Sequence, residues 1–379
     1  MSIEQLEILH SKDWHSVRDI YVPVEVSGDS PSFKVESTRL DQTVVYAGRI
    51  QPYRLDLAND PEARNILQTL IFSSDRDRAR IEMNERKYRA QRMQTATGET
   101  IALRSIPDVV PAIEQLQMPI GIRALWLDPE LLSGGLALVV GTNGQGKTTT
   151  ASAAIVSRLK QFSGFGIGVE DPPELPLDGF HGKGRFFQVP AFSDNPTEGP
   201  GSGYAQALLA AQRFVPSLPA GGSIVFFGEI RDARTALEAL LMASNGHLVI
   251  ATMHGQSVGA ALRKLTTWAM ATAEQTPQEV VWRLLAESLR LVQHQQLQHN
   301  WSENKEDKDK KRERWDEAVV NCSILSMQGE KNKPLYDVVV AGQIEKIAAY
   351  ARAHSSLINK SESSSAYQIK QELMAAKIT

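Results

Sequence analysis

The chain has a single cysteine, Cys322, among its 379 residues. One thiol cannot build a disulfide framework or a multi-cysteine zinc site, so both are excluded. A lone cysteine fits a reducing compartment, and its expected role is to fill space in an apolar core.

Long apolar runs are also missing. The longest, near Leu136 and Ile224, fall far short of the ~20 residues needed to cross a bilayer. The first residues, MSIEQLEILH, contain neither a basic region nor an apolar core, so they do not resemble a signal peptide. We therefore expect a soluble, cytoplasmic protein without a transmembrane segment.

Neither sign of charge dominates. The 41 Lys and Arg residues against 44 Asp and Glu residues give a formal net charge of -3. No direct nucleic-acid partner is expected from this balance, and partners must be argued from sites. The length is sufficient for two or three domains.

The strongest pattern present is LALVVGTNGQGKTTT, which ends at Thr150. Its apolar start predicts a strand buried on both faces of a parallel sheet. Gly141, Gly146, Lys147 and Thr148 then fill the spacing G-x-x-x-x-G-K-T, and residues 149–160 have helical spacing. Strand, glycine loop and helix thus occur in the order of a phosphate-binding loop, which disfavours the alternative of a glycine-rich turn that binds nothing.

The residue types of this loop suit a triphosphate. Several backbone N–H groups must hold it at once, and glycines let the chain curl close around it. Lys147 supplies a charge for the terminal phosphates, and Thr148 supplies a hydroxyl for Mg²⁺. The predicted cofactor-binding residues are Gly141, Thr142, Asn143, Gly144, Gln145, Gly146, Lys147, Thr148 and Thr149.

Residues 1–128 are predicted to form a small α/β domain with its connector. Strand-like segments surround a helix at 61–72, and three later segments, at 79–83, 88–95 and 100–105, form a meander. The meander region is rich in arginine, at Arg76, Arg78, Arg80, Arg86, Arg89, Arg92 and Arg104. Arginines on an exposed strand face most often only carry solvated charge. The alternative is that one or two of these side chains reach a phosphate bound elsewhere.

Residues 129–379 alternate between strands and helices, which predicts a parallel sheet. The expected strands are 166–169, 224–227 and 248–252, and the expected helices are 204–214, 233–244, 258–273, 278–294 and 343–353. Residues 179–203 are predicted to be ordered but irregular, residues 298–316 to be a solvated loop, and residues 318–327 and 335–340 to form a returning hairpin.

Polar residues follow three of the expected strands. Glu170 and Asp171 come at the end of the first strand, where open α/β sheets bind ligands. For Asp171, the alternative role of capping a turn is equally favoured by the local sequence. Glu229 ends the next, as a Mg²⁺-water site requires, but many strands end in an acid. His247 and His254 flank the third, and their position beside these acids favours a phosphate-facing role over that of turn residues.

Three segments together resemble the type II/type IV secretion ATPase superfamily. They are the glycine loop, VEDPPE at 169–174 and FFGEIRDARTALEALLMASNGHLVIATMHGQS at 226–257. This superfamily includes type IV pilus motors and conjugation ATPases. IALRSIP at 101–107 is similar to the segment that closes the family's PAS-like N-terminal domain, and the likeness spans about residues 75–345. The implied fold is a PAS-like α/β domain followed by a RecA-like P-loop core.

The resemblance also implies roles. Glu170 would be the general base, Glu229 the Walker B-type carboxylate that helps Thr148 to hold Mg²⁺, and His247 and His254 would sense the terminal phosphate of ATP. Arg104 would approach the nucleotide, and Arg213 matches a basic position before the Walker B strand. The implied assembly is a homo-oligomeric ring, usually a hexamer, that works with inner-membrane platform or secretion-complex proteins at the cytoplasmic face of the membrane.

The sequence departs from the family pattern in several places. Leu209 replaces an arginine, Gly255 replaces a frequent threonine, and the loop at 193–203 is long. The absent tetracysteine zinc module favours retraction, conjugation or type IVB members. The leading hypothesis is an ATP-hydrolysing ring motor. The alternative is a weakly hydrolysing nucleotide-binding scaffold, and a DNA-translocating motor is disfavoured by the near-neutral charge.

Overall fold

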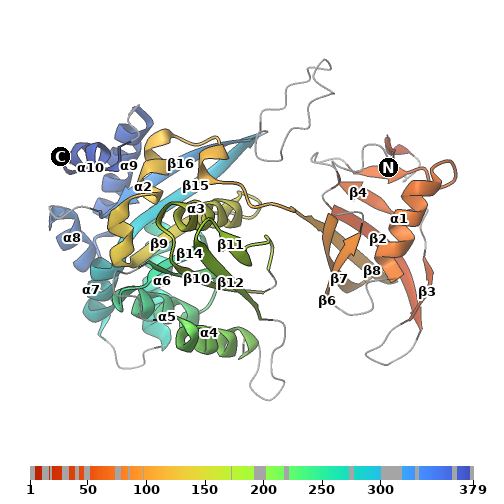
Figure 1. The fold of residues 1–379 in the computed structure, drawn as a ribbon, viewed down its shortest axis with the longest axis horizontal. Helices are drawn as coiled ribbons and strands as arrows, with labels where there is room; N and C mark the ends of the chain where they lie inside the picture. Colours follow the sequence, from red (N-terminus) through yellow and green to blue (C-terminus); the bar gives the residue numbers. More distant parts are fainter. Residues whose placement is uncertain are drawn as a thin grey trace. The chain divides into compact units, whose positions relative to one another are not determined.

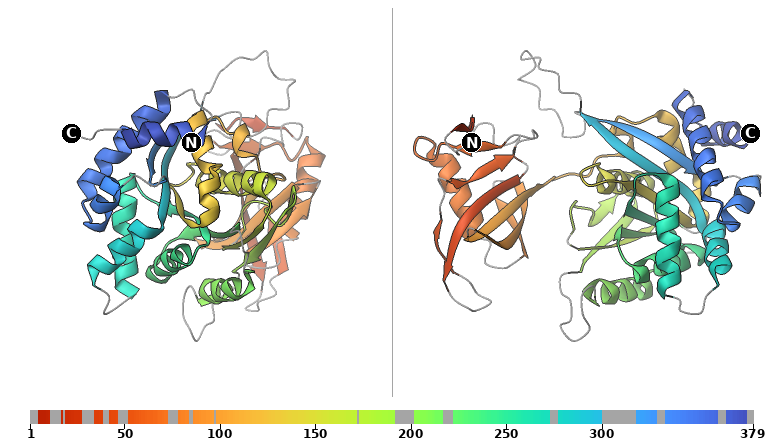
Figure 2. Two further views of the ribbon diagram at one scale, coloured as in Figure 1. Left: turned by 60° about the vertical axis from the view of Figure 1, so that its left-hand side comes forward. Right: turned by 180° about the vertical axis from the view of Figure 1, so that it is seen from behind.

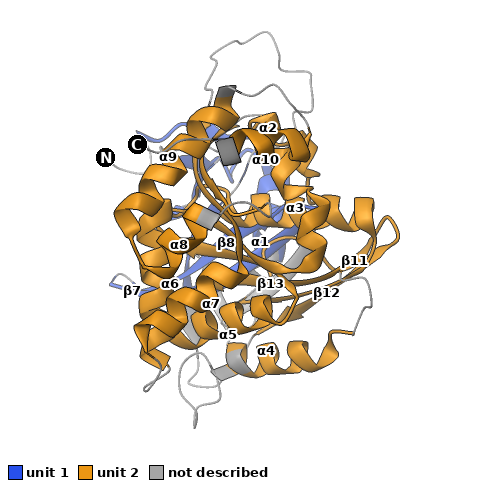
Figure 3. Cartoon of the chain, turned by 90° about the vertical axis from the view of Figure 1, so that its left-hand side faces the viewer, with its two compact units in different colours: residues 1–109 blue, residues 110–379 orange. Residues whose placement is uncertain are grey.

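A computed structural model gives the arrangement of the chain. It describes residues 5–10, 17, 19–27, 34–38, 42–46, 52–72, 78–83, 86–96, 98–171, 173–191, 202–216, 222–272, 277–299, 318–328, 333–360 and 365–375. The chain separates into two compact units, residues 1–109 and residues 110–379, which Figure 3 colours differently. Each unit has a hydrophobic core of its own.

The N-terminal unit is a sheet with one helix (Figure 1). Its elements are β1 (Ile8–Leu9), β2 (Asp19–Ser27), β3 (Lys34–Thr38), β4 (Val44–Tyr46), β5 (Tyr53–Leu55), α1 (Pro61–Phe72), β6 (Arg78–Met83), β7 (Arg86–Thr95) and β8 (Gly98–Ile106). The strand order is β1-β5-β4-β2-β8-β7-β6, with β3 also paired to β2. Only the β1–β5 pair is parallel among the pairs described.

Local sequence explains these elements. Pro61 starts α1, where its missing N–H costs nothing, and Asp60 accepts a hydrogen bond from the Ala63 N–H at 3.0 Å. Alternate residues of β2, such as Ile20 and Val22, are fully buried. The helix predicted at 61–72 and the three-stranded meander are confirmed. That this unit is a PAS-like domain stays a prediction.

The C-terminal unit is a larger α/β layer structure. Its first elements are the short 3₁₀ helices η4 (Ile113–Gln115) and η5 (Pro129–Ser133), with α2 (Ile120–Trp126) between them, then β9 (Gly135–Gly141), α3 (Lys147–Phe162), β10 (Phe165–Glu170), β11 (Gly179–His181), β12 (Gly184–Pro190) and α4 (Ser202–Phe214). They are followed by β13 (Ser223–Ile230), α5 (Ala233–Ser244), β14 (Leu248–His254), α6 (Val258–Thr272), α7 (Gln278–Ser288), β15 (Leu289–His299), β16 (Ala318–Ser326), α8 (Lys333–Val340), α9 (Ile344–Lys360) and α10 (Ala366–Ala375).

The sheet of this unit has the order β11-β12-β10-β13-β14-β9-β15-β16. The six strands from β12 to β15 run parallel, and the two edge strands are antiparallel to their neighbours. The predicted α/β class with a parallel-rich sheet is therefore confirmed. Because parallel strands end at the same edge, the loops that follow β9, β10, β13 and β14 share that edge.

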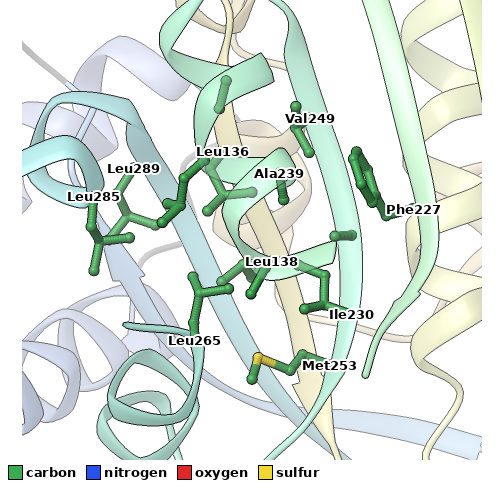
Figure 4. Close-up of a cluster of buried hydrophobic side chains, with 14 of the residues drawn as sticks. Leu136, Leu138, Phe227, Ile230, Ala239, Val249, Met253, Leu265, Leu285 and Leu289 are labelled. Carbon is green, nitrogen blue, oxygen red and sulfur yellow. The ribbon is translucent and has the colours of Figure 1, made fainter. Parts of the chain in front are cut away.

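Both faces of the sheet are covered by helices (Figure 2). In β9, Leu136, Leu138 and Val140 pack on the face covered by α4 to α8, and Figure 4 shows part of this layer. Ala137 and Val139 pack on the opposite face with α2, α3 and α10. A strand buried on both sides needs apolar residues at every position, which explains the unbroken run.

The division between the units lies before the predicted domain boundary near Asp128. The units divide at 109/110, so residues 110–128, which were predicted to belong with the N-terminal domain, are part of the C-terminal unit. Ile113, Ile122 and Trp126 are completely buried there in the layer that contains α3. Apolar burial, which stabilises a domain by about 1.5 to 3 kcal/mol for each large side chain, fixes the connector in place.

Two predicted features of the C-terminal unit are wrong. The expected strand at 335–340 is helix α8, because Leu335 and Val339, four residues apart, are buried on one helical face. The helix expected at 278–294 ends at Ser288, and the chain continues as β15, which pairs with β16. This pairing joins segments separated by residues 300–317, so local propensity does not reveal it.

The segment predicted to be irregular contains regular structure. Residues 179–190 form the antiparallel pair β11–β12 around a turn at Gly182, whose φ is 62°. Residues 192–201 lie outside the described residues, as does most of the predicted solvated loop at 298–316. Among the described residues, every helix is too short or too polar to cross a bilayer.

Candidate functional site

The loop between β9 and α3 has the backbone of an anion cradle. Gly144 and Gly146 have φ values of 73° and 72°, in the left-handed region that disfavours side chains. Gly146 is also the N-cap of α3, and no side chain caps the helix there. Among the described residues, the first-turn N–H groups of α3 therefore have neither an intrahelical partner nor a capping side chain, which suits a bound phosphate.

Lys147, the first residue of α3, folds back over its own loop. Its Nζ donates a hydrogen bond to the Thr142 carbonyl oxygen at 2.8 Å, and the residue is only 9% exposed. Burial lowers the pKa of Lys147, and the charges of Glu229 and Glu174 oppose this shift. An anion in the cradle would compensate the buried ammonium more strongly than a neutral carbonyl does.

The ends of β13 and β14 meet this loop. His254, the last residue of β14, pairs with Gly141 at the start of the loop. Ile230 pairs with Met253, which places Glu229 of β13 at the same edge of the sheet. The side chains of His254 and Glu229 are in contact, with 3.1 Å between Nε2 and Oε1. The structure thus brings together the loop, the acid at the end of β13 and the second histidine.

The environment of His254 favours an uncharged ring. Burial is the main cause that lowers its pKa, and the positive charges of Lys147 and Lys264 act in the same direction, while Glu229 opposes them. At neutral pH the ring is therefore uncharged and has one N–H, which it can donate either to Glu229 or to a phosphate oxygen. A neutral ring can donate to a phosphate oxygen without carrying a charge that competes with Lys147.

The oxygen donors at this edge fit Mg²⁺ rather than a transition metal. Glu229 has a partly exposed carboxylate, and the half-buried Thr148 supplies a hydroxyl in the first turn of α3. Within the part of the chain that the structure describes, no group of three or more His, Cys, Asp or Glu residues could hold a metal ion. Mg²⁺ suits so sparse a set because it retains waters and takes phosphate oxygens as ligands.

Glu170 ends β10 as a buried carboxyl that is 3% exposed. Gln188 of β12 donates to its Oε1 at 2.6 Å and to the Leu175 carbonyl oxygen at 2.7 Å. Burial raises the pKa of Glu170 from its ordinary value of 4.5 to about 7, although the bond from Gln188 favours the charged form. A Cβ at Gly228 would come within 2.8 Å of the Glu170 Cγ, so glycine there makes room for the carboxyl.

Sequence reasoning missed Gln188 and Glu174. Gln188 fell within the segment predicted to be irregular, and the signal for it was the strand pattern of β12. Glu174 follows the paired prolines after Glu170, and its charge acts both on Lys147 and on Glu170. Glu174 therefore acts on two groups whose strands, β10 and β9, are three strands apart, roughly 14 Å.

His247 is not brought to the loop, contrary to the expectation for both histidines. Its Nδ1 is 2.8 Å from the hydroxyl of Ser223, the first residue of β13, and its carbonyl oxygen accepts from the Gly135 N–H at 3.0 Å. These are the N-terminal ends of the strands. The length of β14 separates His247 from His254, about 20 Å, because a pair that flanks a strand lies at opposite edges of the sheet.

Arg213 also lies away from the loop within this chain. The Tyr204 hydroxyl, near the start of α4, donates to the Val169 carbonyl oxygen at 3.1 Å. At the other end of α4, the rings of Phe214 and Phe165 are 6.0 Å apart. The helix therefore runs from the C-terminal end of β10 to its N-terminal end, where Arg213 is exposed.

Arg104 belongs to β8 of the N-terminal unit. Its Nε donates to the Asp19 carboxylate at 2.7 Å, and 57% of its side chain is exposed. A nucleotide-facing role for Arg104 stays a prediction. Of the other arginines of the meander, Arg92 is buried and lies 3.6 Å from Glu99.

The arrangement combines three chemical functions at one edge of the sheet. The uncapped start of α3 and Lys147 can hold phosphate oxygens. Glu229 can hold a divalent cation, and Glu170, with a pKa of about 7, can accept a proton near neutral pH. Holding a phosphate chain, balancing its charge and orienting water are the requirements of phosphoryl transfer to water.

Comparisons with known proteins find related sequences. The family model described as "Type II/IV secretion system protein" matches residues 62–378. An uncharacterized protein of Escherichia coli, YggR, is 34% identical over 53% of this chain and 55% of its own length. The type IV pilus ATPase PilU of Pseudomonas aeruginosa is 28% identical over 52% of this chain and 46% of its own. The chain thus spans about half the length of these curated relatives.

Solved structures share the fold. The pilus retraction motor PilT with bound ADP matches with a TM-score of 0.58 at 20% identity, over 90% of this chain and 88% of that chain. The ATPase DotB of Legionella pneumophila matches with a TM-score of 0.54 at 21% identity, over 87% of this chain and 84% of that chain. At these identities the likeness establishes the fold alone.

Proposed function

We propose that this chain, which belongs to the type II/IV secretion system protein family, is an ATPase subunit that converts Mg-ATP hydrolysis into domain motion in a bacterial secretion or type IV pilus machine. One observation carries the proposal. The uncapped start of α3 meets the ends of β13 and β14 at one edge of the sheet, where Glu229 and His254 are in contact.

The binding roles follow from the contacts of the free chain. Lys147 would exchange its bond with Thr142 for the terminal phosphates, and the N–H groups of the loop would hold the remaining phosphate oxygens. The Thr148 hydroxyl and Glu229 would hold Mg²⁺, which when bound neutralises charge on the phosphoryl oxygens. His254 would exchange its contact with Glu229 for a hydrogen bond to the terminal phosphate.

The proton-accepting role falls to Glu170. Its buried carboxyl is oriented by the 2.6 Å bond from Gln188, and its pKa of about 7 suits a group that accepts a proton from an attacking water at neutral pH. Glu174 would tune both Glu170 and Lys147 by its charge.

The proposed assembly is a homo-oligomeric ring of six subunits. Ring formation would bring arginines, among them Arg104 and Arg213, to a neighbouring subunit's nucleotide, since Arg213 does not reach the loop of its own chain. The proposed place of action is the cytoplasmic face of the inner membrane, through platform or secretion-complex partners.

A second function is a nucleotide-binding scaffold that hydrolyses ATP only slowly. The observation that favours it is Leu209, which is 39% exposed on α4 where the resembled superfamily has an arginine. Loss of one charge-stabilising arginine would slow the chemical step while leaving nucleotide binding intact.

Phosphate release at rising protein concentration tests the proposal. We expect specific activity to rise with concentration as rings form, and the variants Lys147→Ala and Glu170→Gln to lower turnover by roughly a hundredfold or more. The matched controls are Lys160→Ala, at the exposed end of α3, and Glu287→Gln, at an exposed position of α7. Unchanged turnover in the first two variants would overturn the catalytic assignment, and slow turnover independent of concentration would favour the scaffold.

A further inference from the structure

Strand β15 places two glutamines in the apolar layer beneath the phosphate loop. Gln293 and Gln295 are both completely buried. Leu291, which precedes them on the same face of β15, packs among the residues of α2 and α3. A buried amide costs free energy unless its donors and acceptors are bonded, so two of them in an apolar layer call for a physical reason.

These glutamines form a continuous chain of hydrogen bonds that ends in the loop. The Trp126 Nε1 donates to the Gln293 Oε1 at 2.6 Å, and the Gln293 Nε2 donates to the Gln295 Oε1 at 2.9 Å. The Gln295 Nε2 then donates to the backbone carbonyl oxygen of Gln145 at 2.6 Å. We name Trp126, Gln293, Gln295 and Gln145 the amide relay.

The amide relay has one direction. An amide side chain can present either its oxygen or its nitrogen, but an indole N–H can only donate. The Trp126 N–H therefore fixes the Gln293 oxygen toward itself, which turns the Gln293 nitrogen toward Gln295. By the same step, the nitrogen of Gln295 must face the loop. The Trp126 N–H, which does not touch the loop in this chain of bonds, thus decides that Gln295 presents its nitrogen to the loop.

The group that receives this donor is a peptide bond of the loop. The Gln145–Gly146 peptide is planar and trans, so its C=O and N–H point in opposite directions. Holding the Gln145 oxygen toward β15 therefore aims the Gly146 N–H away from β15.

Without this bond, the peptide could turn over. Gly146 has a φ of 72°, and a glycine accepts either orientation of the preceding peptide at little steric cost. The reversed peptide would present a carbonyl oxygen, instead of an N–H, to a bound phosphate. The Leu297 N–H also donates to the Gln145 side-chain oxygen at 2.7 Å, which ties the same residue to β15 a second time.

We infer that the amide relay positions the phosphate loop, and that Gln295, set by Trp126 through Gln293, selects the orientation of the Gln145–Gly146 peptide that accepts a phosphate. The inference rests on the proposed function, because it assigns this loop to a nucleotide. Gln295 and Trp126 are positioning residues that act through the backbone of the loop.

The test is calorimetric titration of the folded full-length chain with ADP and Mg²⁺. Trp126→Phe keeps an aromatic ring and removes the donor, and we expect it to weaken ADP binding roughly tenfold, the effect of one lost hydrogen bond. The matched control is Trp282→Phe, because Trp282 is also buried and its Nε1 has no hydrogen-bond partner among the described residues. Binding by the control should stay within twofold of the unaltered chain.

A second pair of variants guards against loss of folding. Gln295→Met has a similar length and no donor, and its control is Gln296→Met at the next, exposed position of β15. Gln295→Met should weaken ADP binding at least as much as Trp126→Phe, and the double variant should bind no more weakly than Gln295→Met alone, because both act through one contact. A purely structural role would lower the unfolding temperature and leave the affinity of the folded chain unchanged.

Lys147→Ala separates the two ways in which the idea can fail. If it abolishes ADP binding while Trp126→Phe and Gln295→Met bind within twofold of the unaltered chain, the amide relay has no positioning role. If Lys147→Ala still binds ADP normally, the proposed function itself is wrong, and the inference falls with it.

Discussion

Among the proposed site residues, Glu170 has its pKa changed most clearly by burial. Burial at the end of β10 brings its pKa to about 7, and the bond from Gln188 favours the charged form. The same carboxyl at an exposed position would be fully ionised at neutral pH and a weaker base. Its location, rather than its residue type, makes it suitable for proton transfer.

The turnover of Mg-ATP should therefore rise with pH through a limb centred near 7, as Glu170 loses its proton. Gln188→Met removes a hydrogen bond to the carboxylate, so it should raise the pKa of Glu170 and move the limb to higher pH by roughly one unit. The pH dependence of kcat measures this shift. The control is Gln212→Met on α4, which breaks a similar bond, 2.8 Å long, to Glu238 of α5. A limb that stays in place in Gln188→Met would exclude Glu170 as its source.

Stability should depend on the same proton. Because folding raises the pKa of Glu170 above 4.5, the folded state binds the proton more tightly than the unfolded state does. The free energy of unfolding should then fall as pH rises from about 4.5 to 7. Glu170→Gln stays neutral and should reduce this fall by roughly 2 kcal/mol, as measured by urea denaturation at pH 5 and pH 8. A fall of the same size in both proteins would contradict the buried, protonated carboxyl.

At the scale of elements, the turns at the N-terminal edge of the sheet are held by two glycines in contact. Gly134 precedes β9 and Gly246 precedes β14, with φ values of 86° and 91°. A Cβ at Gly134 would clash with the Gly246 carbonyl oxygen, whereas a Cβ at Gly246 would meet nothing within 4 Å.

Gly246→Ala should therefore cost about 1 to 2 kcal/mol of unfolding free energy, the cost of left-handed backbone for a residue with a Cβ. Gly134→Ala should lower the unfolding free energy further, because its Cβ would clash with the Gly246 carbonyl oxygen in addition to the strain of left-handed backbone. Gly246→Asn should cost less than Gly246→Ala, since asparagine tolerates this conformation. Chemical denaturation compares the three variants, and equal losses in Gly134→Ala and Gly246→Ala would show that the clash is relieved.

Elements with a strong local pattern could be predicted from the sequence. The sequence predicts α5 at its observed bounds, 233–244, because Asn245 and Gly246 follow its last residue. The run of valines in α8 fits a strand as well as a helix, so the sequence predicts a strand there. Strand β15 is missed because its pairing depends on the distant strand β16. Local patterns do not contain information on such distant partners.

The site was predicted in part for the same reason. The glycine loop has a sequence signature, and Glu229 and His254 could be placed at its edge by counting parallel strand ends. His247 was misplaced because residues on both sides of a strand lie at opposite edges of the sheet. The bonds from Gln188 and Gln295 depend on strand register, which the sequence alone does not specify.

At the scale of the whole molecule, the chain joins a sheet-rich N-terminal unit to a unit that contains the complete phosphate loop. Two compact units with separate cores are a physical requirement for domain motion, because a single core resists deformation. In the proposed motor, nucleotide at the edge of the larger unit would change how the units pack in the ring.

An experimental structure with Mg²⁺ and a non-hydrolysable ATP analogue tests the central claim most directly. The account predicts that the Lys147 Nζ leaves the Thr142 carbonyl oxygen, now 2.8 Å away, and contacts the terminal phosphates, with Glu229 and His254 facing the same phosphates. A nucleotide bound elsewhere, with the bond between Lys147 and Thr142 intact, would contradict it.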